Sequence, residues 1–317
     1  MSKPAGRVEV LHMFPLDFEE FLWANGVGED SIGHVRSAFL QQTSLDEGIH
    51  SVYMDLFKRY LLVGGLPDAV NAFIDTHNLV NIRAVHDAIY QVYREDAAQY
   101  DSENKLKIRR VYDLVPSNLE NKKKRVQFND IEQKRGRTFA SYEDEFEYLV
   151  ESGITLEVKA VSNPRFPLEE TMTKNLLKLY LNDVGLLTNV LYRTNADAIL
   201  KSEASINLGS VYESVVASEL RAHGCPLYYY DNKSKGEVDF IVNNFQQLSV
   251  LPIEVKSGKD YSIHRSLTKF VGNPEYHVLQ AYVLSNDRLV RVEENILYMP
   301  VYYICFFEPF SKDEVII

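Results

Sequence analysis

Two short segments near the C-terminus carry residue types that bind metal ions and move protons. In residues 237–242 the two-residue period of a strand directs Asp239 away from the apolar side chains on either side of it. In residues 252–256 the same period directs Glu254 and Lys256 to one polar face. If the two strands are neighbours in a sheet, Asp239, Glu254 and Lys256 converge on one patch.

This patch has the composition of a metal-dependent phosphodiesterase site. Two carboxylates close together suit a hard divalent cation such as Mg²⁺ or Mn²⁺. A lysine beside them can orient a water molecule and offset charge that develops on a phosphate. Glu213, on a predicted helix before the first strand, is a candidate third carboxylate. The sequence therefore predicts Asp239, Glu254 and Glu213 as metal ligands, and these three with Lys256 as catalytic residues. A Glu-x-Lys spacing is also typical of solvated pairs on strand faces, so a face without catalytic activity stays the alternative.

Strands and helices that could position these residues alternate along residues 205–317. Short β-branched or aromatic runs bounded by Asn, Gly, Pro and Asp predict four strands, and apolar residues at helical spacing predict two helices. The predicted helices are 211–222 and 262–271, and the predicted strands are 227–230, 238–242, 250–255 and 277–284. The order is helix, three strands, helix, strand, which indicates a compact α/β domain.

The preceding residues predict a mostly helical half. Phe18, Phe21 and Leu22 have the spacing of a buried helical stripe, and the Gly-Gly-Leu-Pro segment at 64–67 ends one helix and begins another. Helices followed by a short hairpin at residues 116–194 are typical of a winged helix. Residues 195–207 are the best candidate for a linker. The predicted fold class is therefore α/β with several domains.

One basic segment lies within an acidic chain of net charge -11. Residues 105–137 contain eleven basic and four acidic side chains, a local balance of about +7. The candidates for nucleic-acid phosphate contacts are the consecutive residues Lys122, Lys123, Lys124 and Arg125, although a charge run is also typical of a solvated face. The net negative charge argues against indiscriminate polyanion binding by the whole surface.

Composition excludes several classes of protein. Of the 317 residues, 45% are hydrophobic and 25% charged, with 15 Gly and 11 Pro, which excludes collagen-like and disordered chains. The longest nearly uncharged run, 296–307, contains Pro300 and is shorter than the about 18 apolar residues of a membrane-spanning helix. With two cysteines and no signal-peptide pattern, we expect a cytoplasmic protein without a membrane partner. The eight histidines show no zinc-site spacing.

The predicted catalytic residues and the order of the elements that carry them resemble the site of the PD-(D/E)xK nucleases, the restriction endonucleases and their relatives. The matching residues are Glu213, Asp239 and Glu254-x-Lys256. Longer motifs resemble a prokaryotic AAA-type ATP-binding family whose C-terminal half is called domain of unknown function 4143. These motifs are residues 6–11, 14–22, 60–67 and 179–187. The resemblance implies the end of an ATPase core and the start of a lid at 1–50, a helical lid at 51–115, the winged-helix-like section at 116–194 and the nuclease-like domain at 205–317.

The chain departs from that family because no segment has the Gly-x-x-x-x-Gly-Lys-(Ser/Thr) pattern that cradles nucleotide phosphates. We therefore expect ATP to bind only in a full-length relative and not to be hydrolysed by this polypeptide alone. The resemblance implies a truncated, C-terminal part of a AAA-type ATPase-family protein that binds nucleic acid and hydrolyses phosphodiesters with Mg²⁺ or Mn²⁺. Two alternatives stay open. One is an interaction module on an inactive nuclease fold, with a protein or nucleic-acid partner; the other is an ATP-binding protein whose P-loop lies in a missing N-terminal segment or a separate ATPase chain.

Overall fold

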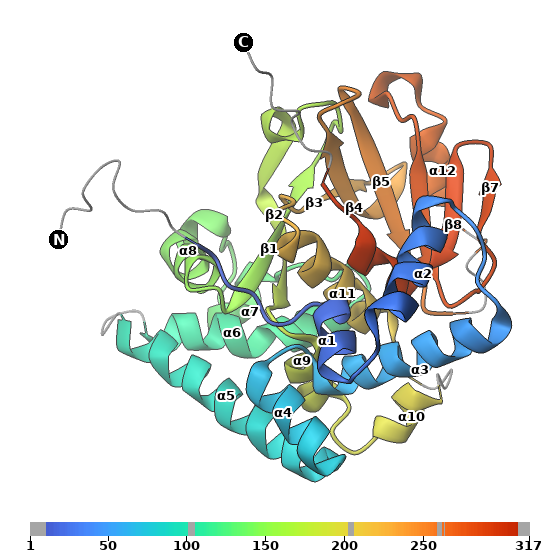
Figure 1. The fold of residues 1–317 in the computed structure, drawn as a ribbon. Helices are drawn as coiled ribbons and strands as arrows, with labels where there is room; N and C mark the ends of the chain where they lie inside the picture. Colours follow the sequence, from blue (N-terminus) through green and yellow to red (C-terminus); the bar gives the residue numbers. More distant parts are fainter. Residues whose placement is uncertain (1–10, 101–104, 202–205, 259–261, 263, 310–317) are drawn as a thin grey trace.

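The computed structural model describes residues 11–100, 105–201, 206–258, 262 and 264–309. Its strands form one mixed eight-stranded sheet in the order β2-β1-β3-β4-β5-β6-β8-β7, and the helices of the N-terminal half gather at one end of this sheet (Figure 1). The predicted mixed α/β class, with helices concentrated in the N-terminal half, is confirmed. Residues 6–10 of the first predicted family motif lie outside the described residues.

The sheet combines antiparallel and parallel pairs. Antiparallel pairs join β1 to β2, β3 to β4, β4 to β5 and β7 to β8, and parallel pairs join β1 to β3, β5 to β6 and β6 to β8. The strands are β1 (Thr155–Val161), β2 (Met172–Leu181), β3 (Tyr228–Asn232), β4 (Gly236–Asn244), β5 (Ser249–Val255), β6 (Ala281–Ser285), β7 (Arg291–Glu293) and β8 (Ile296–Pro300).

The helices of the N-terminal half begin at local capping signals that the sequence contains. Asp17, for example, accepts a hydrogen bond from Glu20 N at the start of the first helix, and Pro67 occupies the first turn of the fourth. The α-helices are α1 (Phe18–Ala24), α2 (Glu29–Leu40), α3 (Glu47–Val63), α4 (Pro67–Thr76), α5 (Leu79–Tyr100), α6 (Lys105–Glu120), α7 (Phe128–Glu132), α8 (Glu143–Glu151), α9 (Val184–Leu191), α10 (Ala196–Leu200), α11 (Gly209–Ala222) and α12 (Arg265–Val271). Short 3-10 helices are η1 (Phe139–Ser141), η2 (Leu168–Thr171), η3 (Pro274–Tyr276) and η4 (Val301–Phe306).

The predicted order of helix, three strands, helix and strand is present as α11, β3, β4, β5, α12 and β6. Both faces of the central strands are covered, because α11 contributes Val211 and Val215 to one hydrophobic cluster and α12 contributes Leu267 and Phe270 to another. As a result every residue of β5 is buried, including the charged Glu254.

A β-bulge interrupts the regular alternation of β4. Tyr228 of β3 pairs with Ile241 and Tyr230 with Val238, so three steps along β4 match two steps along β3. An extra residue in one strand reverses the side-chain alternation beyond it. Val238 and Phe240, which the strand period places on one face, therefore pack in different hydrophobic clusters. Asp239 lies within this irregular segment.

The hairpin expected in the winged-helix-like section belongs to the main sheet. It consists of β1 and β2, and β1 continues the sheet by pairing in parallel with β3, with Lys159 opposite Tyr228. The expected linker also contains structure, because α10 buries Ala196 and Ile199. The sections 116–194 and 205–317 thus share one sheet instead of forming separate ones. Within the described residues, no helix is both long enough and apolar enough to cross a membrane.

Candidate functional site

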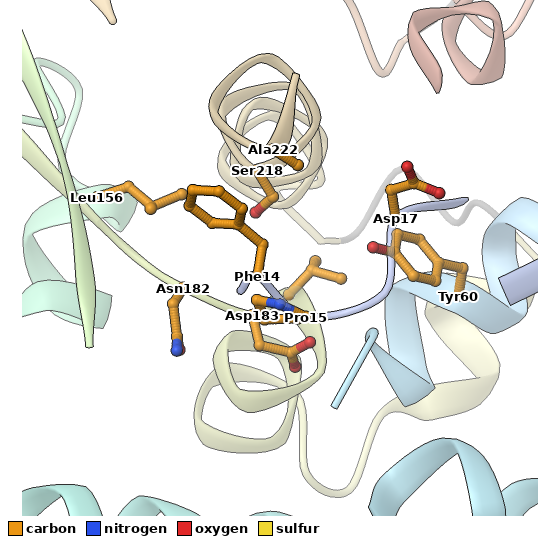
Figure 2. A pocket seen from close by; sticks show the side chains of 10 residues that line it. Phe14, Pro15, Asp17, Tyr60, Leu156, Asn182, Asp183, Ser218 and Ala222 are labelled. Atoms are coloured by element: carbon orange, nitrogen blue, oxygen red, sulfur yellow. The ribbon is translucent and has the colours of Figure 1, made fainter. Parts of the chain in front are cut away.

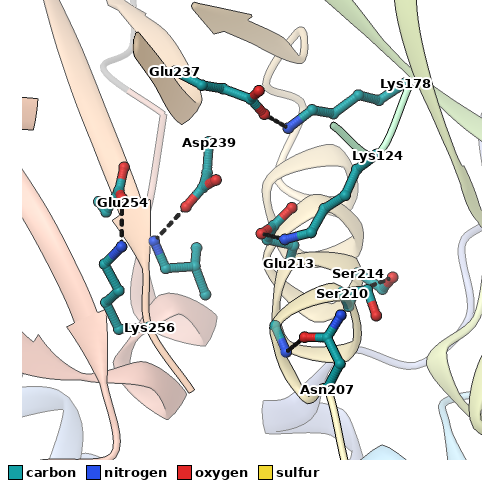
Figure 3. A network of polar contacts seen from close by, with 12 residues as sticks. Lys124, Lys178, Asn207, Ser210, Glu213, Ser214, Glu237, Asp239, Glu254 and Lys256 are labelled. Atoms are coloured by element: carbon teal, nitrogen blue, oxygen red, sulfur yellow. Dashed lines mark hydrogen bonds and ion pairs between the residues drawn. The ribbon is translucent and has the colours of Figure 1, made fainter. Parts of the chain in front are cut away.

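All four predicted catalytic residues line one open cavity of about 350 Å³. Glu213 projects from α11, Asp239 from β4 and Glu254 from β5, and Lys256 follows β5 directly (Figure 3). The regular pairing of β4 with β5 explains the convergence. Phe240 stands opposite Ile253, so the next positions along the two strands are Asp239 and Glu254.

Asp239 and Glu254 differ in how their carboxylates are held. Asp239 Oδ2 accepts a 2.9 Å hydrogen bond from Val255 N, which fixes its carboxylate against β5. Glu254 Oε1 accepts a 2.7 Å hydrogen bond from Lys256 Nζ. Glu254 is only 6% exposed, and its Oε2 is buried without a hydrogen-bond partner among the described residues. A buried carboxylate oxygen in a cavity wall without a partner is costly, and it marks the place where a ligand would be stabilised.

Glu213 has partners of its own at the cavity wall. It is 2% exposed, forms an ion pair with Lys124 Nζ and accepts a 2.9 Å hydrogen bond from Tyr180 Oη. Both of its oxygens are therefore engaged. Glu213 therefore lines the same cavity as Asp239 but is paired with Lys124.

Lys178 and Tyr180 belong to this network but were not among the predicted site residues. Lys178 is fully buried, and its Nζ lies 2.5 Å from Glu237 Oε1 and 4.6 Å from the centre of the Tyr229 ring. Both come from β2, which is far from β4 in the sequence. The one sequence signal is the nearly continuous apolar run 176–181, which is typical of a strand covered on both faces and places Lys178 on the same face as Tyr180.

The pKa shifts differ among the three carboxyl groups of the cavity. Burial raises the pKa of Asp239 well above its usual range, and the charges of Glu213 and Glu254 raise it further. Burial also raises the pKa of Glu254. Burial opposes ionisation of Glu213 as well, but the charges of Lys124 and Lys178 outweigh it and lower the Glu213 pKa. Glu213 therefore holds its charge at neutral pH more readily than Asp239.

The lysines of the network are stabilised in their charged form. Burial acts to lower the pKa of each, yet the surrounding carboxylates more than compensate, so the pKa is raised at Lys124, Lys178 and Lys256. Three ammonium groups thus face the four carboxyl groups of Glu213, Glu237, Asp239 and Glu254 (Figure 3).

The predicted nucleic-acid-binding run does not form one exposed surface. Lys122 and Lys123 are exposed, but Lys124 lines the cavity and pairs with Glu213. The Arg125 guanidinium lies 2.7 Å from Asp231 Oδ2, and both side chains are largely buried. Only the first two residues of the run are therefore placed to meet a phosphate backbone directly, while the third lies inside the cavity.

The three predicted metal ligands do not form a compact group. Among the described residues, the set of three His, Cys, Asp or Glu side chains whose potential ligand atoms lie within 4.8 Å of one another is Asp17, Glu219 and His223. The prediction of Glu213 as a third ligand beside Asp239 and Glu254 does not match this geometry, because Lys124 and Tyr180 hold its carboxylate.

Comparison with known proteins identifies two regions. Residues 208–304 match the family described as Domain of unknown function (DUF4143), and residues 54–197 match Domain of unknown function (DUF8612). No curated protein and no solved structure matches the chain. The predicted similarity of the C-terminal part to domain of unknown function 4143 is therefore confirmed, and the second match runs across residues 51–115 and 116–194 as one unit. All four predicted catalytic residues lie within the DUF4143 match.

Proposed function

We propose that the cavity is a metal-dependent phosphodiesterase site that acts on nucleic acid, with Asp239 and Glu254 as the metal-binding carboxylates. The observation that carries this proposal is the convergence of Asp239, Glu254 and Lys256 on one cavity, together with the buried Glu254 Oε2, which has no hydrogen-bond partner among the described residues. The resemblance of these residues and of the surrounding element order to the PD-(D/E)xK nucleases supports it.

The residues fit a divalent cation such as Mg²⁺ or Mn²⁺. Four carboxyl groups against three ammonium groups leave an excess of negative charge in a poorly solvated place. Burial raises the pKa of both Asp239 and Glu254, and the charges of Glu213 and Glu254 raise the Asp239 pKa further. Oxygen ligands of this kind are the ones that hard cations prefer. When bound, such a cation would polarise a phosphate oxygen and lower the pKa of a water molecule.

The chain's own residues supply the remaining functions. Lys256 uses one N–H donor on Glu254, which leaves further donors to orient an attacking water or a phosphate oxygen. Glu213 contributes as a positioning residue, because it anchors Lys124 at the cavity wall where a phosphate would pass. Lys122 and Lys123, exposed beside Lys124 in the sequence, extend the positive charge outward and attract the nucleic-acid backbone.

We also infer that the chain is part of a AAA-type ATPase-family protein. The motifs at residues 14–22, 60–67 and 179–187 support this relationship, together with the DUF4143 match. Nucleotide binding would then require a P-loop that this sequence does not contain. A pull-down with an ATPase chain that is encoded nearby, with nucleotide hydrolysis as the readout, tests this inference.

A non-catalytic interaction module is the second candidate, and one observation favours it. Glu213 and Glu254 each already have a lysine partner, so the network can neutralise much of its own charge without a metal ion. In that case the cavity is a structural core of buried ion pairs, and nucleic acid or protein binds elsewhere on the surface.

A cleavage assay separates the two candidates. We expect the wild-type protein with Mn²⁺ or Mg²⁺ to cleave a mixture of DNA and RNA substrates, and we expect Glu254→Gln and Lys256→Ala to lose at least about a hundredfold in rate. Glu275→Gln, at an exposed carboxylate outside the cavity, is the matched control and should cleave like the wild type. Cleavage by Glu254→Gln at the wild-type rate would refute the phosphodiesterase proposal.

A further inference from the structure

A second cluster lies toward the other end of α11 from Glu213. Asp17, Glu219 and His223 each offer a potential ligand atom, and these atoms lie within 4.8 Å of one another. Glu219 and His223 are four residues apart, so they share one side of the helical turn that ends α11. Asp17 comes from the N-cap of α1, more than 200 residues earlier in the chain.

Each of the two carboxylates uses one oxygen in a hydrogen bond to the backbone at the start of α1. Asp17 Oδ1 accepts a 2.7 Å hydrogen bond from Glu20 N and thereby caps α1. Glu219 Oε1 accepts a 2.8 Å hydrogen bond from Phe18 N, one residue further along the same helix start. The remaining oxygens are Asp17 Oδ2, which faces His223 Nε2 at 3.5 Å, and Glu219 Oε2, which has no hydrogen-bond partner among the described residues.

His223 also uses one of its polar atoms in a hydrogen bond to the backbone. Its Nδ1 lies 2.6 Å from Phe307 O, and because a carbonyl only accepts, Nδ1 carries the proton of this hydrogen bond. A backbone carbonyl on one ring nitrogen is the usual device that aims the other nitrogen of a histidine at a metal ion. Nε2 lies 3.5 Å from Asp17 Oδ2, close to the roughly 3.4 Å that separates ligand atoms in a tetrahedral zinc site.

An independent observation points to a ligand at this position. Glu219 has no exposed surface, and its Oε2 has no hydrogen-bond partner within the described part of the chain. Burial raises the pKa of Glu219 to about 8, which shows how poorly a carboxylate without a ligand is solvated there. Buried polar atoms are nearly always satisfied, so this oxygen calls for a partner.

We propose that Asp17, Glu219 and His223 bind a first-row divalent metal ion, with Zn²⁺ the best match. Imidazole nitrogen and carboxylate oxygen are both ligands that Zn²⁺ accepts, and the two carboxylates balance its charge. The ion would clamp the start of α1 to the end of α11 and so join the helical half to the sheet. This site is separate from the cavity of Asp239 and does not depend on the proposed function.

A small cavity lies beside Asp17. It measures about 10 Å³, enough for one water molecule, and Asp17 is part of its wall (Figure 2). Ser218 and Ala222, each directly before Glu219 or His223 in α11, line the same cavity.

Titration of Zn²⁺ into the full chain, followed by calorimetry and thermal unfolding, tests the proposal. The wild type should bind Zn²⁺ at this site, and its Tm should rise by several degrees in excess Zn²⁺. Glu219→Gln keeps the acceptor for Phe18 N, and Asp17→Asn keeps the helix cap, yet each should weaken Zn²⁺ binding at least about tenfold and abolish most of the Tm increase. His34→Asn removes an exposed histidine as the control.

Two further measurements make the outcome decisive. Co²⁺ added to the wild type should give the visible absorption bands of a low-coordinate nitrogen and oxygen site, which requires no variant to fold. In the Asp239→Asn background, where the cavity of Asp239 contributes no metal binding, a Zn²⁺-dependent Tm increase should persist and should still be lost on Glu219→Gln, so failure of the cavity proposal and failure of this one are distinguishable. Zn²⁺ that leaves the wild-type Tm unchanged, or that binds Glu219→Gln with wild-type affinity, would overturn the proposal.

Discussion

Lys178 is a fully buried charge that depends on several neighbours at once. Its Nζ lies 2.5 Å from Glu237 Oε1, and the charges of Glu213 and Asp239 also keep its pKa raised despite burial. Removing one member of a buried ion pair leaves the other charges uncompensated, which costs more than the pair itself contributes. Lys178 and the carboxylates around the cavity therefore stabilise each other's charged forms.

Replacing Lys178 by Met tests this dependence. We expect Lys178→Met to lower the free energy of unfolding by about 3 kcal/mol, measured by urea denaturation, because three carboxylates lose a shared counter-ion. Lys201→Met is the matched control: Lys201 pairs with Asp197 on the surface, and its loss should change stability by less than about 0.5 kcal/mol. Equal stability of Lys178→Met and the wild type would show that the network is not needed for folding.

His50 gives the protein a defined response to acid. Its Nδ1 lies 2.9 Å from Tyr302 Oη, and burial lowers its pKa below the usual value. Between the folded-state pKa and about 6.5, the unfolded chain therefore takes up a proton that the folded chain does not. Stability should be unaffected by this group above that range and should decrease as the pH falls through it.

Denaturation at about pH 7.5 and about pH 5.5 measures this effect. His50→Gln can still hydrogen-bond to Tyr302 but does not titrate, so its loss of stability on acidification should be smaller than that of the wild type. If both proteins lose the same stability between the two pH values, His50 does not contribute.

At the scale of elements, the alternation of apolar residues located the strands but not their irregularities. Strands β3 to β6 were predictable because turn residues bound each of them, and Asp239, Glu254 and Lys256 were predictable because β4 and β5 are consecutive. The bulge in β4 depends on how β3 pairs with β4. The spacing of apolar residues within β4 alone carries no information about that pairing.

Contacts between distant segments were not predictable for the same reason. The strands β1 and β2 join the main sheet through a parallel pair with β3, and nothing local in either strand specifies that partner. Lys178 and Tyr180 consequently went unpredicted, and Glu213 was expected to coordinate metal when its nearest partner is Lys124. The local periodicity predicted which residues face inward, and only the three-dimensional arrangement shows which of them meet.

The turn between α3 and α4 is an element whose close packing can be tested. Gly65 lies so near the segment before α1 that an added Cβ would stand 1.9 Å from Leu16 O, a backbone atom. We expect Gly65→Ala to lower the free energy of unfolding by about 2 to 3 kcal/mol, measured by urea denaturation. Gly33→Ala, inside α2 with open space around it, should be neutral or stabilising by up to about 1 kcal/mol. A neutral Gly65→Ala would mean that these segments do not pack as described.

For the whole molecule, the net charge of -11 means that the proposed binding to nucleic acid requires a restricted basic surface. Lys122 and Lys123 are exposed, while Lys124 and Arg125 are engaged with Glu213 and Asp231. The first two lysines should therefore carry the salt-dependent part of nucleic-acid affinity.

Fluorescence anisotropy with a labelled oligonucleotide measures that contribution. The double variant Lys122→Ala/Lys123→Ala should bind more weakly, and the slope of log affinity against log salt should decrease by about one per lysine removed. Lys58→Ala, on α3, serves as the control and should leave the slope unchanged. An unchanged slope in the double variant would place the binding surface elsewhere.

The proposed function requires Asp239 and Glu254 together to bind a divalent cation, which a Mn²⁺ titration measures. The titration uses the Glu219→Gln protein as the background, so that the separate cluster at α1 and α11 does not contribute. We predict that this protein binds Mn²⁺ and that the additional change Asp239→Asn, or Glu254→Gln, weakens binding at least about tenfold. Mn²⁺ affinity that is absent, or that is unchanged by both substitutions, would contradict the account.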